Sequence, residues 1–177
     1  MTDIKQKGPG DRVPQTTFRV RRDGDWTTWQ SADIFAGRAV VVFALPGAFT
    51  PTCSKSHLPG FKRDAAAIRA AGVDEIYCLS VNDSFVMNAW AKDQEVADDE
   101  VTMLPDGNAD FTRDMGMLVD RSVLGFGPRS WRYAMVVRDG VIERMFVEDR
   151  DAPGDPFQVS GAPAVLAYLN GRAAAAD

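Results

Sequence analysis

The residues best suited to chemistry in this sequence lie in one short segment, residues 46–53, which ends at Cys53. Thr50 and Pro51 predict a helix start, because threonine is a good helix cap and proline is tolerated at the first helical position. Cys53 then lies in the first turn, where free backbone N–H groups and the helix dipole favour the thiolate form. A thiolate is a nucleophile, so we predict that Cys53 is reactive rather than an inert buried thiol.

The single histidine, His57, offers two alternative interpretations of this cysteine. Cys53 and His57 are four residues apart, a spacing that lets two helical side chains bind one metal ion. They could also be the nucleophile and base of a Cys–His hydrolase. The sequence nearby holds no third or fourth ligand cluster and no signature of such a hydrolase. We therefore predict no metal site here and a structural role for His57.

Two apolar patterns flank the reactive segment and predict the elements that position it. Residues 39–45 are branched and aromatic, which is typical of a strand buried on both faces. Apolar residues from Leu58 to Ile68 recur every three or four positions and predict a helix that ends at Gly72, with Pro59 distorting its first turns. Because ligands of α/β proteins bind beyond the carboxyl ends of such strands, the sequence predicts a site at this junction.

The rest of the chain alternates between apolar segments and turn residues, which predicts an α/β fold with a mixed central sheet and helices on both faces. We expect a frayed C-terminal tail from Ala173 onward. The further predicted elements are an N-terminal β-hairpin (18–22 and 26–29), a short helix from Ser31, a strand over 76–81, a helix after a cap at 82–84, a short helix within 106–115, a second hairpin (133–137 and 141–147) and a final helix around 163–169.

Composition limits the class of protein. The 177 residues are 45% hydrophobic and 25% charged, which predicts one globular domain over residues 1–177 that needs no disulfide or metal for stability. A net charge of −5 argues against nucleic acids and anionic membranes as partners. The apolar run 39–45 is too short to span a bilayer, and the first residues do not resemble a signal peptide. With only Cys53 and Cys78, we expect a protein of a reducing compartment, the cytoplasm.

The reactive segment also carries a family resemblance. Pro46, Thr50 and Cys53 match the Pro-x-x-x-Thr-x-x-Cys motif of peroxiredoxins, and PGAFTPTCSKSHLPGF (46–61) is similar to their type II, or type five, subfamily. Thr50 stands where a Cys-x-x-Cys motif has its first cysteine, which favours a peroxidase over a dithiol oxidoreductase. The resemblance implies a thioredoxin-like fold. It extends over about residues 5–169 and is also carried by segments 78–83, 132–137 and 147–148.

The resemblance implies roles for the residues of the motif. Cys53 is the expected peroxidatic nucleophile, and the Thr50 hydroxyl is expected to bond both sulfur and peroxide. Pro46 is expected to shield the site from water. Together with Thr50 and the catalytic arginine, Pro46 and Thr52 are the expected substrate-binding residues.

Two arginines compete for the role of the catalytic arginine, which in the subfamily lies directly before the aromatic residue that opens a late strand. Arg132 precedes Tyr133 and therefore matches that position. Arg129 is the rival, and we expect it to be a surface or loop-anchoring residue.

The residue that completes the catalytic cycle is less clear from the resemblance. Animal members carry a resolving cysteine in the region that corresponds to residues 157–160, where this chain has none. Plant and bacterial members have a cysteine at the position of Cys78 and are often reduced by glutathione with glutaredoxin. Cys78 lies in an apolar strand, so we expect it to be buried, with a raised pKa and little reactivity. It stays a possible resolving residue.

The resemblance thus implies a peroxidase that reduces hydrogen peroxide and alkyl hydroperoxides through a cysteine sulfenic acid, in antioxidant defence and redox homeostasis. Glutathione and glutaredoxin are the expected reductants. The sulfur does the redox chemistry, so no cofactor and no metal are expected. Members of the subfamily commonly form dimers, so the resemblance also implies a homodimer. Two alternatives stay open: a thioredoxin-dependent peroxidase that uses Cys78 as resolving cysteine, and a redox sensor or holdase.

Overall fold

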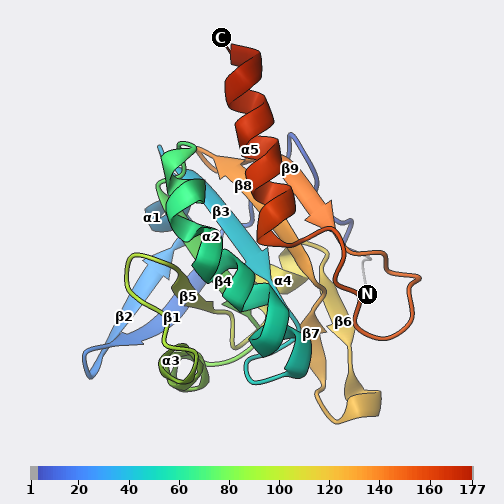
Figure 1. Ribbon diagram of the computed structural model, residues 1–177. Coiled ribbons are helices and arrows are strands. Elements are labelled where there is room, and N and C mark those ends of the chain that lie inside the picture. The colour runs from blue at the N-terminus through green and yellow to red at the C-terminus, as the bar shows by residue number, and fades with distance from the viewer. Residues whose placement is uncertain (1–3, 177) are drawn as a thin grey trace.

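A computed structural model describes residues 4–176, and a five-stranded mixed sheet runs through its centre in the order β5-β4-β3-β8-β9 (Figure 1). The strands β5, β4 and β3 are parallel, β8 runs antiparallel to them, and β9 runs antiparallel to β8 and therefore in the same direction as β3. This arrangement confirms the predicted mixed sheet. The strands are β3 (Ala39–Ala44), β4 (Glu75–Ser80), β5 (Thr102–Pro105), β8 (Tyr133–Arg138) and β9 (Val141–Val147).

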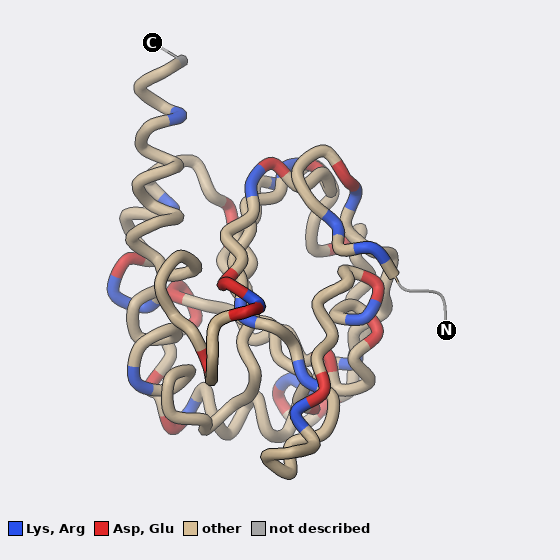
Figure 2. The backbone as a smooth tube through the Cα atoms, turned by 90° about the vertical axis from the view of Figure 1, so that its right-hand side faces the viewer, with Lys and Arg blue, Asp and Glu red and all other residues tan. Residues whose placement is uncertain are grey.

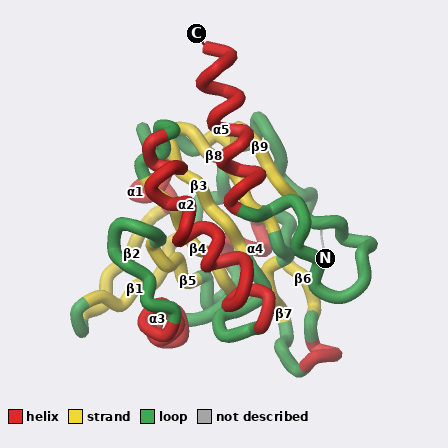
Figure 3. Tube along the Cα trace, viewed as in Figure 1, coloured by secondary structure: helices red, strands yellow, loops and turns green. Residues whose placement is uncertain are grey.

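Three helices cover one face of the sheet: α2 (Leu58–Ala70), α3 (Ser84–Asp93) and α5 (Ala162–Ala176) (Figure 3). Their apolar side chains form one core with alternate residues of the strands. Phe61 of α2 stacks on Phe43 of β3, with ring centroids 4.0 Å apart. Burial of such large side chains fixes α2, and therefore the segment before it, against the central strand.

The N-terminal hairpin and two short helices cover the opposite face, where a second core forms. The hairpin turns at Asp23 and Gly24, whose φ angles of 51° and 87° suit a tight primed turn. Both faces are thus covered, as the sequence predicts. The elements on this face are β1 (Thr17–Arg22), β2 (Asp25–Gln30), α1 (Ser31–Phe35) and α4 (Asp110–Asp114).

The structure differs from the sequence predictions at the edges of the fold. A small sheet of β6 (Leu118–Asp120) and β7 (Pro128–Ser130), joined through a 3₁₀ turn at Ser122–Leu124, is not predicted, because three-residue strands carry no periodicity. The expected frayed tail from Ala173 is wrong as far as the structure extends, since α5 continues to Ala176. Alanine is the strongest helix former, which explains the continuation.

Charged residues of both signs are interspersed along the chain (Figure 2). Within residues 4–176, the structure holds no helix that is both long and apolar enough to cross a bilayer.

Candidate active site

The loop after β3 turns sharply to bring the chain into the helix that carries Cys53. Phe49 adopts a φ of 63°, a left-handed conformation that is unfavourable for a bulky residue and tends to occur at functional sites. The Thr50 hydroxyl donates to the Gly47 carbonyl (2.7 Å), and the Ala48 N–H donates to Oδ1 of Asn82 (3.0 Å) beyond the end of β4. These bonds hold the strained loop at the carboxyl edge of the sheet, where the sequence predicts the site.

The first turns of the helix are wider than an α-helix. Residues Cys53–His57 form a π-helical turn, in which the N–H of Leu58 donates to the carbonyl of Cys53 five residues earlier. Pro59 follows directly and has no N–H to donate, so the distortion lies where the sequence predicts it. Cys53 and His57 are both fully buried on the inner side of this turn. Single π turns of this kind are frequent at functional sites.

Arg132 contacts the sulfur of Cys53. Its Nη2 lies 3.3 Å from Cys53 Sγ, and its Nη1 lies 2.9 Å from Nδ1 of His57. Asp155 accepts two more bonds, from Nε (3.1 Å) and Nη2 (2.6 Å). Burial disfavours the charge of Arg132, but Cys53 and Asp155 more than offset this and raise its pKa. The Arg132 guanidinium thus places a hydrogen-bond donor and a positive charge directly beside the Cys53 sulfur.

His57 links Arg132 to the loop beyond β9. Its Nε2–H donates to the carbonyl of Ser160 (3.0 Å), which leaves Nδ1 as the acceptor for Arg132. Burial, and then the charge of Arg132, lower the pKa of His57 to about 3, so the ring is neutral near pH 7. The sequence prediction of a structural role is therefore incomplete, because this ring holds the arginine that contacts the sulfur.

A buried carboxylate fixes the loop that reaches His57. Oε1 of Glu148 accepts bonds from the backbone N–H groups of Gln158, Val159 and Ser160, and from the Ser160 hydroxyl, at 2.8–2.9 Å. Burial raises the pKa of Glu148, but these donors more than offset it and leave the pKa below its ordinary value. In the same loop, the ring of Phe157 lies 4.8 Å from that of His57.

Arg129, the rival arginine, has different contacts. Its Nη1 donates to the carbonyl of Val81 (3.3 Å) and its Nε to the carbonyl of Phe126 (3.0 Å). It therefore anchors loops, as the sequence predicts, while Arg132 lies beside the thiol.

A cavity of about 480 Å³ is lined by Asp155, the partner of Arg132, and brings together the other candidate residues, Pro46, Thr50 and Thr52. Val123, Leu124 and Phe126 make most of its lining apolar, and Arg121, Gly154 and Asp155 complete it together with Pro51. Its size and apolar walls suit a small ligand with an apolar substituent.

Cys78 lies on β4 opposite Phe43 and is fully buried in the core on the α2 side of the sheet. Burial is the main cause that raises its pKa well above the ordinary value, and Cys53 adds to this effect. Both cysteines are free thiols. Within the part of the chain that the structure describes, no group of three or more His, Cys, Asp or Glu residues is arranged to hold a metal ion.

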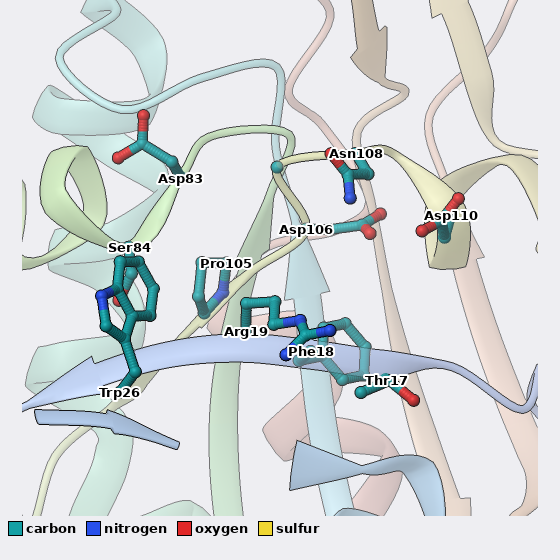
Figure 4. Close-up of a pocket in the computed structure, with 11 residues that line it drawn as sticks. Thr17, Phe18, Arg19, Trp26, Asp83, Ser84, Pro105, Asp106, Asn108 and Asp110 are labelled. Carbon is teal, nitrogen blue, oxygen red and sulfur yellow. The ribbon is translucent and has the colours of Figure 1, made fainter. Parts of the chain in front are cut away.

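A smaller cavity of about 140 Å³ lies between the N-terminal hairpin and the loop before α4 (Figure 4). Its lining includes Trp26, Asp83 and Asp106. Asp106 accepts bonds from Phe111 and Thr112, so it caps α4. Unlike the larger cavity, it is lined by no residue that is hydrogen-bonded to Arg132, and its carboxylates are occupied with local structure.

Comparisons with known proteins place the chain in context. The family model described as Redoxin matches residues 8–166. The chain is 51% identical to the hybrid peroxiredoxin hyPrx5 of Haemophilus influenzae over 160 residues, which are 90% of this chain but 65% of that longer protein. It is also 51% identical to peroxiredoxin sll1621 of Synechocystis, covering 91% of this chain and 90% of that one.

A solved structure agrees with these sequence matches. The crystal structure of reduced Prx3 in complex with hydrogen peroxide, from Vibrio vulnificus, superposes with a TM-score of 0.86 at 40% identity and covers 95% of this chain and 99% of that one. The thioredoxin-like fold with a central mixed sheet and an N-terminal hairpin is thereby confirmed.

Proposed function

The chain belongs to the type II subfamily of peroxiredoxins, which are thiol peroxidases, and on this premise we propose that Cys53 reduces hydrogen peroxide and organic hydroperoxides. One observation carries the assignment: the guanidinium of Arg132 lies 3.3 Å from the sulfur of Cys53 at the start of a helix. The Vibrio relative crystallised with hydrogen peroxide supports the choice of oxidant.

In the first half-reaction, the thiolate of Cys53 attacks one peroxide oxygen. An S–O bond forms as the O–O bond breaks, so the sulfur loses two electrons and becomes a sulfenic acid. The leaving oxygen takes the electron pair and then a proton, which gives water or an alcohol. Arg132 donates to the negative charge that develops on this oxygen.

The threonines and the proline at the cavity bind and shield the peroxide in this proposal. The Thr50 hydroxyl donates to Gly47, which leaves its lone pairs free to accept the peroxide O–H. Pro46 and Thr52 line the same cavity and limit the access of water. These residues orient the peroxide so that the oxygen under attack faces the Cys53 sulfur and the leaving oxygen faces Arg132.

In the second half-reaction, an external thiol reduces the sulfenic acid. A glutathione thiol forms an S–S bond with Cys53, and its proton leaves with the hydroxyl as water. A second thiol, from glutaredoxin or glutathione, then attacks the glutathione sulfur of the mixed disulfide, which forms a new disulfide with that sulfur and releases Cys53 as a thiol. Residues 157–160 hold no cysteine, and the thiol of Cys78 is buried with a raised pKa. Both facts support an external reductant over an internal one.

The reductant assignment can be tested by measuring peroxide consumption with glutathione and glutaredoxin, and in parallel with thioredoxin and its reductase. We expect turnover with the first pair and, by mass spectrometry, a glutathione adduct on Cys53. Turnover with thioredoxin alone, together with a Cys53–Cys78 bridge, would contradict the glutathione assignment. A single oxidation without turnover under either condition would point to a redox sensor instead.

We also propose a homodimer formed through the face that bears the cavity. Three large apolar side chains of its lining are exposed, those of Val123, Leu124 and Phe126, and exposed apolar patches of this kind are typical of protein interfaces. Analytical ultracentrifugation should show a dimer that Leu124→Glu converts to a monomer.

The two free thiols fit a reducing compartment, for which we propose the cytoplasm.

A further inference from the structure

Asp155 covers the solvent-facing edge of the arginine that contacts the reactive sulfur. The side chain of Arg132 is 1% exposed and that of Asp155 is 37% exposed, so the carboxylate lies between the guanidinium and the solvent. Two bonds join them, from Nε to Oδ1 (3.1 Å) and from Nη2 to Oδ2 (2.6 Å). This is a bidentate pair, the arrangement with which arginine ordinarily recognises a carboxylate ligand.

The remaining hydrogens of Arg132 are nearly all committed. The other Nη2 hydrogen points to Cys53 Sγ, and one Nη1 hydrogen points to Nδ1 of His57. Among the described residues, one Nη1 hydrogen is left without a hydrogen-bond partner. A single donor suits a peroxide oxygen, but it cannot form the two parallel bonds that an incoming carboxylate needs.

Asp155 also sets the charge at the wall of the cavity. It lines the cavity beside Pro46, Thr50 and Thr52, close to the residues that flank the sulfur. Arg121 is the other charged residue of this lining, and its guanidinium lies over the ring of Trp131 at 5.1 Å. The side chains hydrogen-bonded to Arg132 are those of Cys53, the neutral His57 and Asp155, and Asp155 is the one carboxylate among them.

Asp155 is held in place by the loop that Glu148 anchors. The loop begins after β9 and ends at Gln158, Val159 and Ser160, whose N–H groups Glu148 binds. Phe157, two residues after Asp155, lies with its ring 5.7 Å from the Arg132 guanidinium. A carboxylate anchored in this way stays over the arginine when a substrate enters.

From these contacts we propose that Asp155 is a specificity-determining residue that favours uncharged hydroperoxides over those that carry a carboxylate. It occupies the edge of Arg132 that would bind an anion, and it repels negative charge from the partly buried cavity wall. This inference rests on the proposed peroxidase function of Cys53. We expect the charge of Asp155 to make the rate constant for a carboxylate-bearing hydroperoxide about tenfold lower than that for an uncharged one.

The test compares 4-hydroperoxybutanoate with its methyl ester, because the two differ in charge and share the reacting group. Second-order rate constants for Cys53 oxidation are measured by stopped-flow fluorescence in the wild-type protein and in Asp155→Asn. We expect the wild type to react about tenfold faster with the ester, and Asp155→Asn to bring the ratio close to one. Asp155→Glu, which keeps the charge, should retain the preference.

Asp151→Asn is the matched control, because Asp151 is an exposed residue of the same loop and its loss changes the net charge equally. It should leave the ratio unchanged. An equal change in this control, or an unchanged ratio in Asp155→Asn, would overturn the proposal. A wild-type preference for the carboxylate that Arg121→Gln abolishes would overturn it as well, by assigning selection to Arg121.

A measurement on the wild-type protein alone guards against variants that fold poorly. Added salt screens the repulsion, so the rate with the carboxylate should rise relative to the rate with the ester. Absence of this rise would contradict the proposal. If the wild type reduces neither compound and not hydrogen peroxide either, the proposed function fails; if it reduces hydrogen peroxide but shows no preference for the ester over the carboxylate, only the role of Asp155 fails.

Discussion

Cys53 and Cys78 lie in the same core, both fully buried and both as free thiols, yet their surroundings differ in charge. Cys53 lies at a helix start and accepts a bond from Arg132. Cys78 lies in the middle of β4, paired with Phe43 on one side and Met103 on the other. On the proposed function, in which Cys53 is the nucleophile, burial alone does not make a thiol inert. The difference is that the Arg132 guanidinium donates directly to the sulfur of Cys53, whereas burial dominates the surroundings of Cys78.

The strongest test of this comparison is removal of the reactive sulfur. Cys53→Ser replaces the thiol with a hydroxyl of nearly the same size, which is not ionised near neutral pH. We expect peroxide consumption to fall to background while the circular dichroism spectrum is unchanged. Retained turnover in this variant would show that the nucleophile lies elsewhere.

Removal of the positive charge of Arg132 should have the second largest effect on peroxide reduction. Arg132→Met keeps much of the side-chain volume but removes the donor to the sulfur and to the leaving oxygen. We expect the rate constant for sulfenic acid formation to fall by about 10²–10³, as for other donors that stabilise developing negative charge. The matched control is Arg129→Met, which removes loop contacts and should cost far less. The reverse order of effects would exchange the two assignments.

The neutral ring of His57 predicts a pH dependence of stability. Its pKa is lowered to about 3 in the folded protein from 6.5 in a free side chain, so the unfolded chain binds the proton more tightly. The stability from this neutral ring is present above pH 6.5 and is lost as the pH falls toward 3, by on the order of a few kcal/mol.

Urea denaturation between pH 7 and pH 4 measures this loss. In His57→Gln, an uncharged side chain replaces the histidine, and the decrease in unfolding free energy over this range should be smaller than in the wild type. Parallel pH profiles of the two proteins would contradict the assignment of a buried neutral ring.

The smallest effect is expected at the second cysteine. Cys78→Ser places a small polar group in an apolar strand and should lower stability by about 1–2 kcal/mol. Turnover with glutathione and glutaredoxin should stay within about twofold of the wild type, because no step of the proposed cycle uses this thiol. Loss of turnover with retained folding would instead make Cys78 a resolving residue.

The sequence predicted the central elements well because they depend on local patterns. The buried strand over 39–45, the helical stripe from Leu58 and the hairpin turn at Asp139 and Gly140 all appear close to their expected positions. The motif around Cys53 also indicated the site, and the structure brings Thr50 to the same cavity as Pro46 and Thr52.

The roles of the residues that hold Arg132 and His57 in place could not be predicted from local patterns. Asp155 and Glu148 lie in or beside an irregular loop without periodicity, and their roles arise only when that loop folds back against Arg132 and His57. Glu148 lies in a segment that carries the family resemblance, but nothing in the sequence indicates which groups either carboxylate binds. The sequence shows the spacing of His57 from Cys53, but the bond of His57 to Arg132 depends on the sheet that brings β8 next to the helix.

The π turn at Cys53–His57 makes the length of this segment as important as its composition. A π turn contains one residue more than the α-helical turn it replaces, so deleting Lys55 or Ser56 would let the helix close into regular α geometry. One residue corresponds to about 100° of rotation in an α-helix. The deletion would therefore turn Cys53 away from Arg132 while α2 stayed packed on the sheet. We therefore expect a change in the length of Cys53–His57 to abolish activity, whereas substitution of the exposed side chain of Lys55 should be tolerated.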